Sequence, residues 1–249
     1  MTLQLENITF GFNKNKPILK DISFTLDEKK IYALMGSNGA GKTTLFNIIT
    51  GFIKSQSGTV SFYKKNITNQ QPFKISRRGI SRTFQDVRIT TKLNVIENVI
   101  LAMRHNPTDK WPKALLPEYF YLSSNRALAK KANEIVEQFF LTDIKNSLAG
   151  EISYGQQKLL SLACCVASGA TLLLLDEVVA GIQPEYRAKI GLLISQMKEQ
   201  GKTILIIEHD SDFLAKVADK IYFLHEGRNL EFESIEELRE NSNKEKLYY

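Results

Sequence analysis

Residues 36–43 of this 249-residue chain read Gly-Ser-Asn-Gly-Ala-Gly-Lys-Thr, which fits the pattern G-x-x-x-x-G-K-S/T. A short apolar run, Ile31–Met35, precedes this loop and predicts a buried parallel strand. The segment after it repeats apolar residues at helical spacing, so we expect an amphipathic helix over Lys42–Phe52. A strand, a glycine-rich turn and a helix in this order predict a loop that binds phosphate groups.

Each part of this loop suits a bound polyphosphate. Glycines let the backbone approach an anion closely, and the N–H groups of the loop and of the helix N-terminus face the phosphates. Lys42 would add a positive charge at the β- and γ-phosphates, and the Thr43 hydroxyl suits Mg²⁺. The predicted binding residues of this stretch are Gly36, Ser37, Asn38, Gly39, Ala40, Gly41, Lys42, Thr43 and Thr44.

Two later apolar runs end in polar side chains. Leu172–Leu175 is followed by Asp176 and Glu177, and a second run ends shortly before His209. Ligands of open parallel sheets bind at the carboxyl ends of the strands, so we expect these groups at one edge. Asp176 could hold Mg²⁺ directly or through water, and Glu177 could orient and activate an attacking water. His209 would donate to the γ-phosphate or position that water.

Alternating strands and helices predict a parallel sheet with helices on both faces, preceded by antiparallel strands. Residues from about 91 to 165 are expected to be largely helical, and the tail from Glu233 to form a short amphipathic helix. The stretch 104–123 holds three prolines and the only tryptophan, Trp111, so it is either an exposed loop or a docking surface. Ser153 is a good helix N-cap, and that helix start is either simply capped or a second anion-binding site.

Composition excludes several classes of protein. The formal net charge is +6, but the basic residues occur as scattered pairs, which is typical of solvated faces and does not favour nucleic acid binding. Cys164 and Cys165 are adjacent and poorly placed for a disulfide, so we interpret them as small core residues of a protein in a reduced compartment. His105 and His225 are interpreted as structural. The apolar stretch 159–175 is too short for a membrane span and favours a helix followed by a buried strand.

These motifs resemble those of the ATP-binding subunits of ABC transporters, in order and spacing over essentially the whole chain. Residues 36–43 resemble Walker A, and Leu172–Glu177 resembles Walker B. Gln85 matches the Q-loop, Ala180–Pro184 the D-loop, and His209 the switch histidine. The signature motif corresponds to Ser153, Tyr154, Gly155 and Gln156. Phe12 falls where this family places an aromatic ring that stacks on adenine.

The resemblance implies an α/β fold of the P-loop NTPase type, the ABC cassette, with a RecA-like parallel sheet core, an antiparallel β subdomain and a helical subdomain. It implies a nucleotide-binding core over 1–90, a helical subdomain over 91–165 and the rest of the core over 166–249. It implies ATP hydrolysis with ATP and Mg²⁺ as cofactors. The implied metal residues are Thr43, Gln85 and Asp176, and the implied catalytic residues are Lys42, Glu177 and His209.

The resemblance also implies partners. The cassettes of this family work as head-to-tail dimers, in which Ser153 and Gly155 would cap the γ-phosphate held by the other chain. The implied partners are an identical or paralogous ATPase subunit, integral membrane permeases and, indirectly, a periplasmic or surface solute-binding protein, at the cytoplasmic face of the membrane. Residues around Gln85, Tyr154 and His209 resemble the branched-chain amino acid importer branch, with its urea and amide relatives.

The sequence is also compatible with two other functions. One is a regulatory module that binds ATP without hydrolysing it, against which the presence of both Glu177 and His209 argues. Another is an ABC ATPase outside transport, but those carry coiled-coil arms or two cassettes in one chain, which do not fit this length. The chain departs from the family pattern at Val178 and Cys164, where proline and arginine are usual, and at Phe12, where tyrosine is more common.

Overall fold

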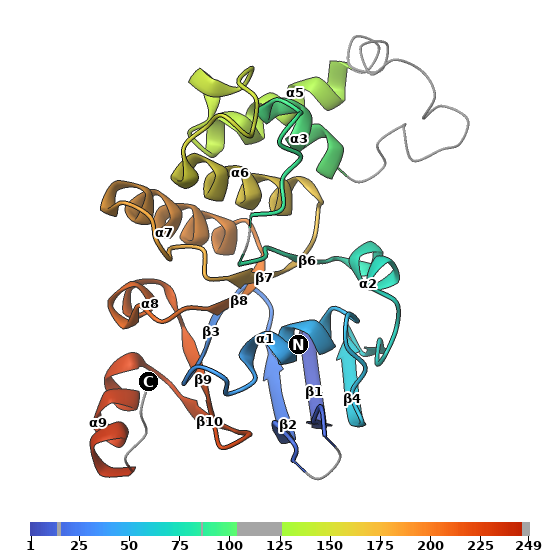
Figure 1. The fold of residues 1–249 in the computed structure, drawn as a ribbon, viewed down its shortest axis with the longest axis vertical. Coiled ribbons are helices and arrows are strands. Elements are labelled where there is room, and N and C mark those ends of the chain that lie inside the picture. The colour runs from blue at the N-terminus through green and yellow to red at the C-terminus, as the bar shows by residue number, and fades with distance from the viewer. Residues whose placement is uncertain (14–15, 86, 104–125, 246–249) are drawn as a thin grey trace. The chain divides into compact units, whose positions relative to one another are not determined.

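The computed structural model describes residues 1–13, 16–85, 87–103 and 126–245, and they fold into two units (Figure 1). Unit 1 comprises Met1–Arg82, Thr171–Ala180 and Ala188–Tyr249. Unit 2 comprises Thr83–Ala170 and Gly181–Arg187.

A mostly parallel sheet forms the centre of unit 1, with the strand order β10-β9-β3-β8-β7-β6. Its strands are β3 (Ile31–Gly36), β6 (Ile80–Arg82), β7 (Leu172–Asp176), β8 (Thr203–Ile207), β9 (Lys220–His225) and β10 (Arg228–Phe232). Only β10 pairs antiparallel, with β9. Every residue of β3, β7 and β8 is buried, which confirms the buried parallel strands expected from their unbroken apolar runs.

The second sheet of unit 1 is antiparallel, with the order β2-β1-β4-β5. It consists of β1 (Leu3–Phe10), β2 (Leu19–Leu26), β4 (Ser57–Phe62) and β5 (Lys65–Asn66). Apolar and polar residues alternate over Ile22–Leu26, which predicts a half-buried strand, and buried and exposed positions alternate over the same residues of β2.

The helices of unit 1 are α1 (Lys42–Ile49), α2 (Pro72–Arg78), α8 (Ser211–Val217) and α9 (Ile235–Glu245). A further helix, α7 (Pro184–Glu199), begins in unit 2 and continues in unit 1. Helix α1 is shorter than expected, and the prediction that it reaches Phe52 was wrong. It ends because Thr50 caps it and Gly51 takes a left-handed conformation with φ 77°. Phe52 therefore lies outside the helix and is 53% exposed.

One hydrophobic core joins the two sheets through α1, which runs between them (Figure 1). Leu45, Phe46 and Ile49 of α1 are fully buried in this core. The same core contains Leu5 from the antiparallel sheet and Leu174 from the parallel one. Packing on both sides fixes the helix that begins at Lys42.

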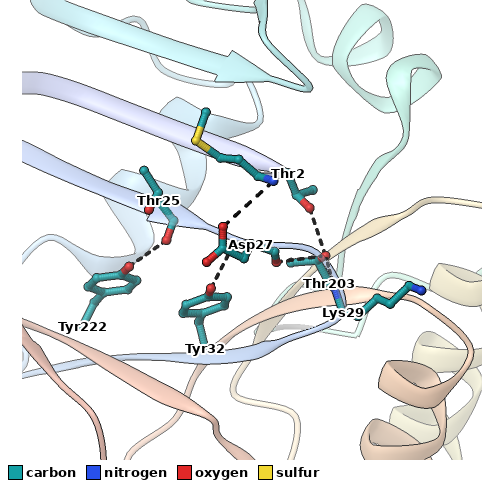
Figure 2. A network of polar contacts seen from close by, with 8 residues as sticks. Thr2, Thr25, Asp27, Lys29, Tyr32, Thr203 and Tyr222 are labelled. Carbon is teal, nitrogen blue, oxygen red and sulfur yellow. Dashed lines mark hydrogen bonds and ion pairs between the residues drawn. The ribbon is translucent and has the colours of Figure 1, made fainter.

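Hydrogen bonds between polar groups also connect the same two sheets (Figure 2). The Tyr222 hydroxyl donates to the Thr25 carbonyl at 2.7 Å, and the Asp27 N–H donates to the Tyr32 hydroxyl at 2.8 Å. The Thr203 hydroxyl lies 3.1 Å from the hydroxyl of Thr2. Burial raises the pKa of both tyrosines, so both phenols stay protonated at neutral pH.

Unit 2 is largely helical. It contains α3 (Val95–Ala102), α5 (Arg126–Gln138), the 3₁₀ turn η3 (Thr142–Ile144) and α6 (Tyr154–Ala167). Helix α3 packs against both α5 and α6. Cys165 is buried, and the Cys164 thiol contacts the Asn98 carbonyl at 3.5 Å, so both cysteines are packed and neither is in a disulfide. The stretch 104–123 lies outside the described residues.

In the part of the chain that the structure describes, no helix combines the length and the apolar character that crossing a bilayer requires.

Candidate active site

The glycine-rich loop connects β3 to α1 in unit 1, and its backbone needs glycine for two different reasons. At Gly36 (φ 142°) a Cβ would lie 2.5 Å from the Leu224 carbonyl oxygen, so a neighbouring strand excludes any side chain. At Gly39 (φ 81°) a Cβ would meet no atom within 4 Å, so the left-handed backbone alone demands glycine. The loop at Gly39 therefore opens to space that a ligand can fill.

Lys42, the first residue of α1, points back into the loop. Its Nζ donates to the carbonyl oxygens of Gly36 at 2.7 Å and Ser37 at 3.0 Å. Burial lowers the pKa of Lys42, and the nearby carboxylates of Glu177 and Asp176 partly oppose that shift. This ammonium is thus held by carbonyls that a bound phosphate could replace.

Two hollows adjoin the loop. One, of about 280 Å³, is lined by Lys42, Thr43 and Thr44 together with Glu177 and His209. Because Gly41 has no side chain to cap α1 and the first turn holds no acidic residue, the helix N-terminus presents uncompensated N–H groups there. The hollow therefore brings the positive charge of Lys42 and of the helix N-terminus together with the carboxyl group of Glu177, in a space large enough for phosphate groups.

The second hollow, of about 630 Å³, continues from the first along Ser37, Asn38 and Gly39. Phe12 lines both hollows and is 72% exposed. Its ring meets that of Phe10 edge-on, with centroids 5.1 Å apart. His225, which the sequence suggests is structural, and Glu226 line the same hollow from the turn between β9 and β10. An exposed ring beside a cavity of this size suits a flat heterocycle.

Strand register explains how the acidic groups meet the histidine. In the parallel pair β7 and β8, Asp176 lies beside Ile207, so residues 177 and 208–209 leave the sheet from the same edge. The N–H of Glu177 donates to the Ile207 carbonyl at 2.9 Å. Glu177 has φ 49°, a strained conformation for a residue with a side chain. Its Oε1 lies 3.6 Å from Nε2 of His209, too long for a hydrogen bond but close enough to share one water.

Glu208 is a site residue that sequence reasoning missed. It is only 3% exposed, and its Oε1 accepts the N–H of Val179 at 2.7 Å. This bond holds the segment that carries Glu177 against the end of β8. Its signal in the sequence was weak, because a carboxylate directly before His209 suggests a ligand as readily as a structural acceptor.

Arg82 was also missed. It ends β6, and its Nη2 donates to Asp176 Oδ2 at 2.7 Å. Its Nη1 donates to Asn47 Oδ1 at 2.6 Å, and its guanidinium lies over the Phe46 ring. Both side chains of the ion pair are nearly buried, 5% exposed for the arginine and 3% for the aspartate. The sequence shows Arg82 only as a neighbour of the Q-loop, because nothing in it reveals the register of β6 on β7.

Unit 2 carries the remaining predicted residues. Ser153 caps α6 in a capping box: its hydroxyl accepts from the Gln156 N–H at 3.3 Å, and its own N–H donates to Gln156 Oε1 at 2.8 Å. Gly155 packs against Tyr186, since a Cβ there would lie 2.6 Å from that ring. Tyr154 is 47% exposed. The Ser153 hydroxyl therefore keeps its proton for another acceptor.

Gln85 is exposed in unit 2, and its backbone carbonyl accepts from Lys158 Nζ at 3.2 Å. That bond uses the main chain of Gln85.

The oxygen groups of unit 1 fit Mg²⁺, which prefers hard oxygen ligands. Thr43 offers a hydroxyl and Asp176 a carboxylate. Among the described residues no group of three or more His, Cys, Asp or Glu could hold a metal ion by itself.

Comparison with known proteins identifies the family. The family model described as ABC transporter matches residues 19–180, which run from the start of β2 to just beyond the end of β7. The chain belongs to the ABC transporter family. It is the ATP-hydrolysing, ATP-binding cassette of such a transporter, which confirms the α/β cassette fold expected from the sequence.

Similar ABC proteins cover nearly the whole chain. BraF of Pseudomonas aeruginosa, a high-affinity branched-chain amino acid transport ATP-binding protein, is 32% identical over 99% of this chain and 96% of its own length. LivG of Salmonella typhimurium, with the same description, is 34% identical over 90% of this chain and 88% of its own. A nucleotide-free ABC cassette of known structure shares 29% identity and a TM-score of 0.82 over 99% of this chain and 96% of its own. An ABC cassette in its ADP conformation matches with the same values.

Proposed function

We propose that this cassette powers the uptake of branched-chain amino acids or related small polar solutes by hydrolysing ATP between two copies of the cassette. The observation that carries the hydrolytic part is the meeting of Lys42, Glu177 and His209 around one phosphate-sized hollow. The proposed solute rests on the similarity to BraF and LivG, whose printed descriptions name branched-chain amino acid transport.

ATP would lie along the two adjoining hollows. Phe12 would stack on the adenine, and residues 36–44 would wrap the phosphates with backbone N–H groups. Lys42 would exchange its bonds to the Gly36 and Ser37 carbonyls for bonds to the β- and γ-phosphate oxygens. Charge-assisted bonds to phosphate are stronger than those to neutral carbonyls, so the exchange favours the bound state.

Hydrolysis needs a water in line with the γ-phosphorus. Glu177 would accept a proton from that water as its oxygen bonds to phosphorus, and the bond to the β–γ bridging oxygen would break with its electron pair leaving on ADP. His209, 3.6 Å from Glu177, would hold the water or donate to the γ-phosphate. The bond from Val179 to Glu208 would keep Glu177 in its strained conformation during this step.

Thr43 and Asp176 of unit 1 are the proposed ligands of Mg²⁺, which would neutralise charge on the β- and γ-oxygens.

A second copy of the cassette, identical or paralogous, would complete the site. The Ser153 hydroxyl and the Gly155 N–H at the start of α6 would bind the γ-phosphate of the other chain's ATP. The absence of acidic residues from the first turn of α6 favours such anion binding. ATP would then stabilise the closed dimer and its cleavage would favour the open one, because only the closed pair contacts the terminal phosphate from both sides. Permease subunits would convert this opening into transport.

The hydrolytic part is tested by ATP turnover of the purified chain and of its Glu177→Gln variant. The variant should bind ATP with Mg²⁺ but release phosphate about 10²–10⁴ times more slowly, since a general base typically contributes that factor. Glu199→Gln, an exposed site on α7 in unit 1, is the matched control and should keep wild-type turnover. Normal turnover in Glu177→Gln would contradict the assigned base, and absence of turnover in the wild type with its permeases would favour a regulatory module.

The transport part needs the membrane complex. The cassette should be purified from membranes with its permeases and binding protein and reconstituted in vesicles. Leucine, isoleucine or valine should stimulate ATP turnover, whereas glutamate should not. Stimulation by urea or an aliphatic amide alone would move the proposal to those relatives, and the absence of any co-purifying membrane protein would contradict it.

A further inference from the structure

Arg82 connects the two elements of unit 1 that carry proposed metal ligands. It bonds Asp176, the last residue of β7, through Nη2 and Asn47 of α1 through Nη1. Asn47 lies four residues after Thr43, so the two share one face of α1. A single rigid side chain thus bridges the face that bears Thr43 and the strand that delivers Asp176.

The geometry of the sheet produces this bridge. In the parallel pair β6 and β7, Arg82 lies beside Leu174, so Asp176 is two residues further along and points to the same side of the sheet. The Phe46 ring covers the guanidinium, with its centroid 5.2 Å from Cζ. Little of the pair reaches solvent, since the arginine is 5% and the aspartate 3% exposed. Solvent screening is therefore weak and the arrangement is fixed.

We propose that Arg82 is a positioning residue, which fixes the proposed Mg²⁺ ligands Asp176 and Thr43 relative to each other. The inference rests on the proposed metal role of these two residues. This role differs from a role in folding alone, because the affinity for Mg²⁺ then depends on both hydrogen bonds of the guanidinium, to Asn47 and to Asp176. Groups that orient metal ligands in this way typically change metal affinity about 10- to 100-fold when removed.

Removing Arg82 has two opposing effects on the affinity for Mg²⁺, and the sign of the net change shows which effect is larger. Loss of a positive charge near Asp176 by itself would strengthen the binding of a cation. Loss of the fixed geometry would weaken it. Lysine separates the two effects, because it keeps the charge but has one ammonium in place of the planar fork that reaches Asn47 and Asp176 together.

The test measures binding rather than turnover. The full chain is titrated with AMP-PNP, an ATP analogue with a non-hydrolysable β–γ bridge, first in EDTA and then at increasing Mg²⁺. Arg82→Lys should raise the Mg²⁺ concentration for half-maximal enhancement about 10- to 100-fold while leaving the affinity in EDTA at the wild-type value. Asn47→Ala should also raise this Mg²⁺ concentration, because the substitution removes the hydrogen bond between the guanidinium and α1. The double variant should match Arg82→Lys, because both changes break one bridge.

Controls separate this inference from general damage and from the proposed function. Arg78→Lys, an exposed site on α2 whose Nε bonds Gln70, should behave as the wild type. Arg82→Gln should also need more Mg²⁺, and tighter Mg²⁺ binding in it would overturn the inference by showing that charge outweighs geometry. Wild-type Mg²⁺ dependence in both Arg82→Lys and Asn47→Ala would overturn it too. If the wild type shows no Mg²⁺ enhancement at all, the metal site itself, and with it the proposed function, is wrong.

Discussion

Replacing Phe12 with alanine separates nucleotide binding from folding, because this ring is exposed. Phe12 is 72% exposed, so about a quarter of it is buried, and its described ring partner is the edge of Phe10. Full burial of a phenylalanine is worth about 1.5–3 kcal/mol, so the substitution should lower the free energy of unfolding by about 0.4–0.8 kcal/mol. Loss of ring stacking on adenine should cost about 0.5–1.5 kcal/mol of binding, which raises the Kd for ATP about 2- to 13-fold.

Calorimetric titration with ATP and urea unfolding measure these two quantities on the same protein. Phe12→Tyr keeps a ring and should retain wild-type affinity. Phe73→Ala is the matched control, because Phe73 on α2 is 51% exposed and is not among the residues that line the two hollows. An unchanged Kd for ATP in Phe12→Ala would refute the proposed adenine position. The adenine would then have to lie elsewhere in the larger hollow, nearer to His225.

Two further predictions concern buried polar groups. Glu208→Ala should lower the free energy of unfolding by about 1–3 kcal/mol, because it leaves the buried Val179 N–H without its acceptor; Glu208→Gln keeps an oxygen acceptor and should lose clearly less in urea unfolding. Burial raises the pKa of Cys164 to about 12, so below that pH the thiolate is scarce. Reaction with a thiol reagent at pH 8 should therefore be slow in the folded protein and reach two thiols only after unfolding in guanidinium; fast native labelling at Cys164 would contradict the described packing of α6.

The fold could be predicted from the sequence wherever burial is complete or strictly alternating. The apolar runs of β3, β7 and β8 and the alternation in β2 each have one simple explanation, and all four strands are confirmed. The end of α1 could not be predicted in the same way. Phe52 continues the helical spacing of the apolar residues, but the helix ends at Ile49, three residues earlier, before the left-handed Gly51. Periodicity carries no information about where backbone dihedrals change.

The residues of the candidate site differ in the same way in how far the sequence predicts them. Residues that act through a local motif, such as Lys42 in its loop, can be found from sequence because the motif is contiguous. Arg82 and Glu208 act through bonds to residues far away in the sequence, and those bonds depend on the register of β6 on β7 and of β7 on β8. His225 lies on the hollow that Phe12 lines because β9 ends at the same edge as β3. A single sequence does not contain these registers.

Sedimentation of Glu177→Gln with and without ATP tests the central claim most directly, because this variant should keep the terminal phosphate intact. The account predicts a dimer with ATP and Mg²⁺, a monomer with ADP, and a monomer with ATP when Ser153→Arg is added to fill the start of α6. A Glu177→Gln chain that binds ATP yet stays monomeric at high protein concentration would contradict the claim that two cassettes share each ATP.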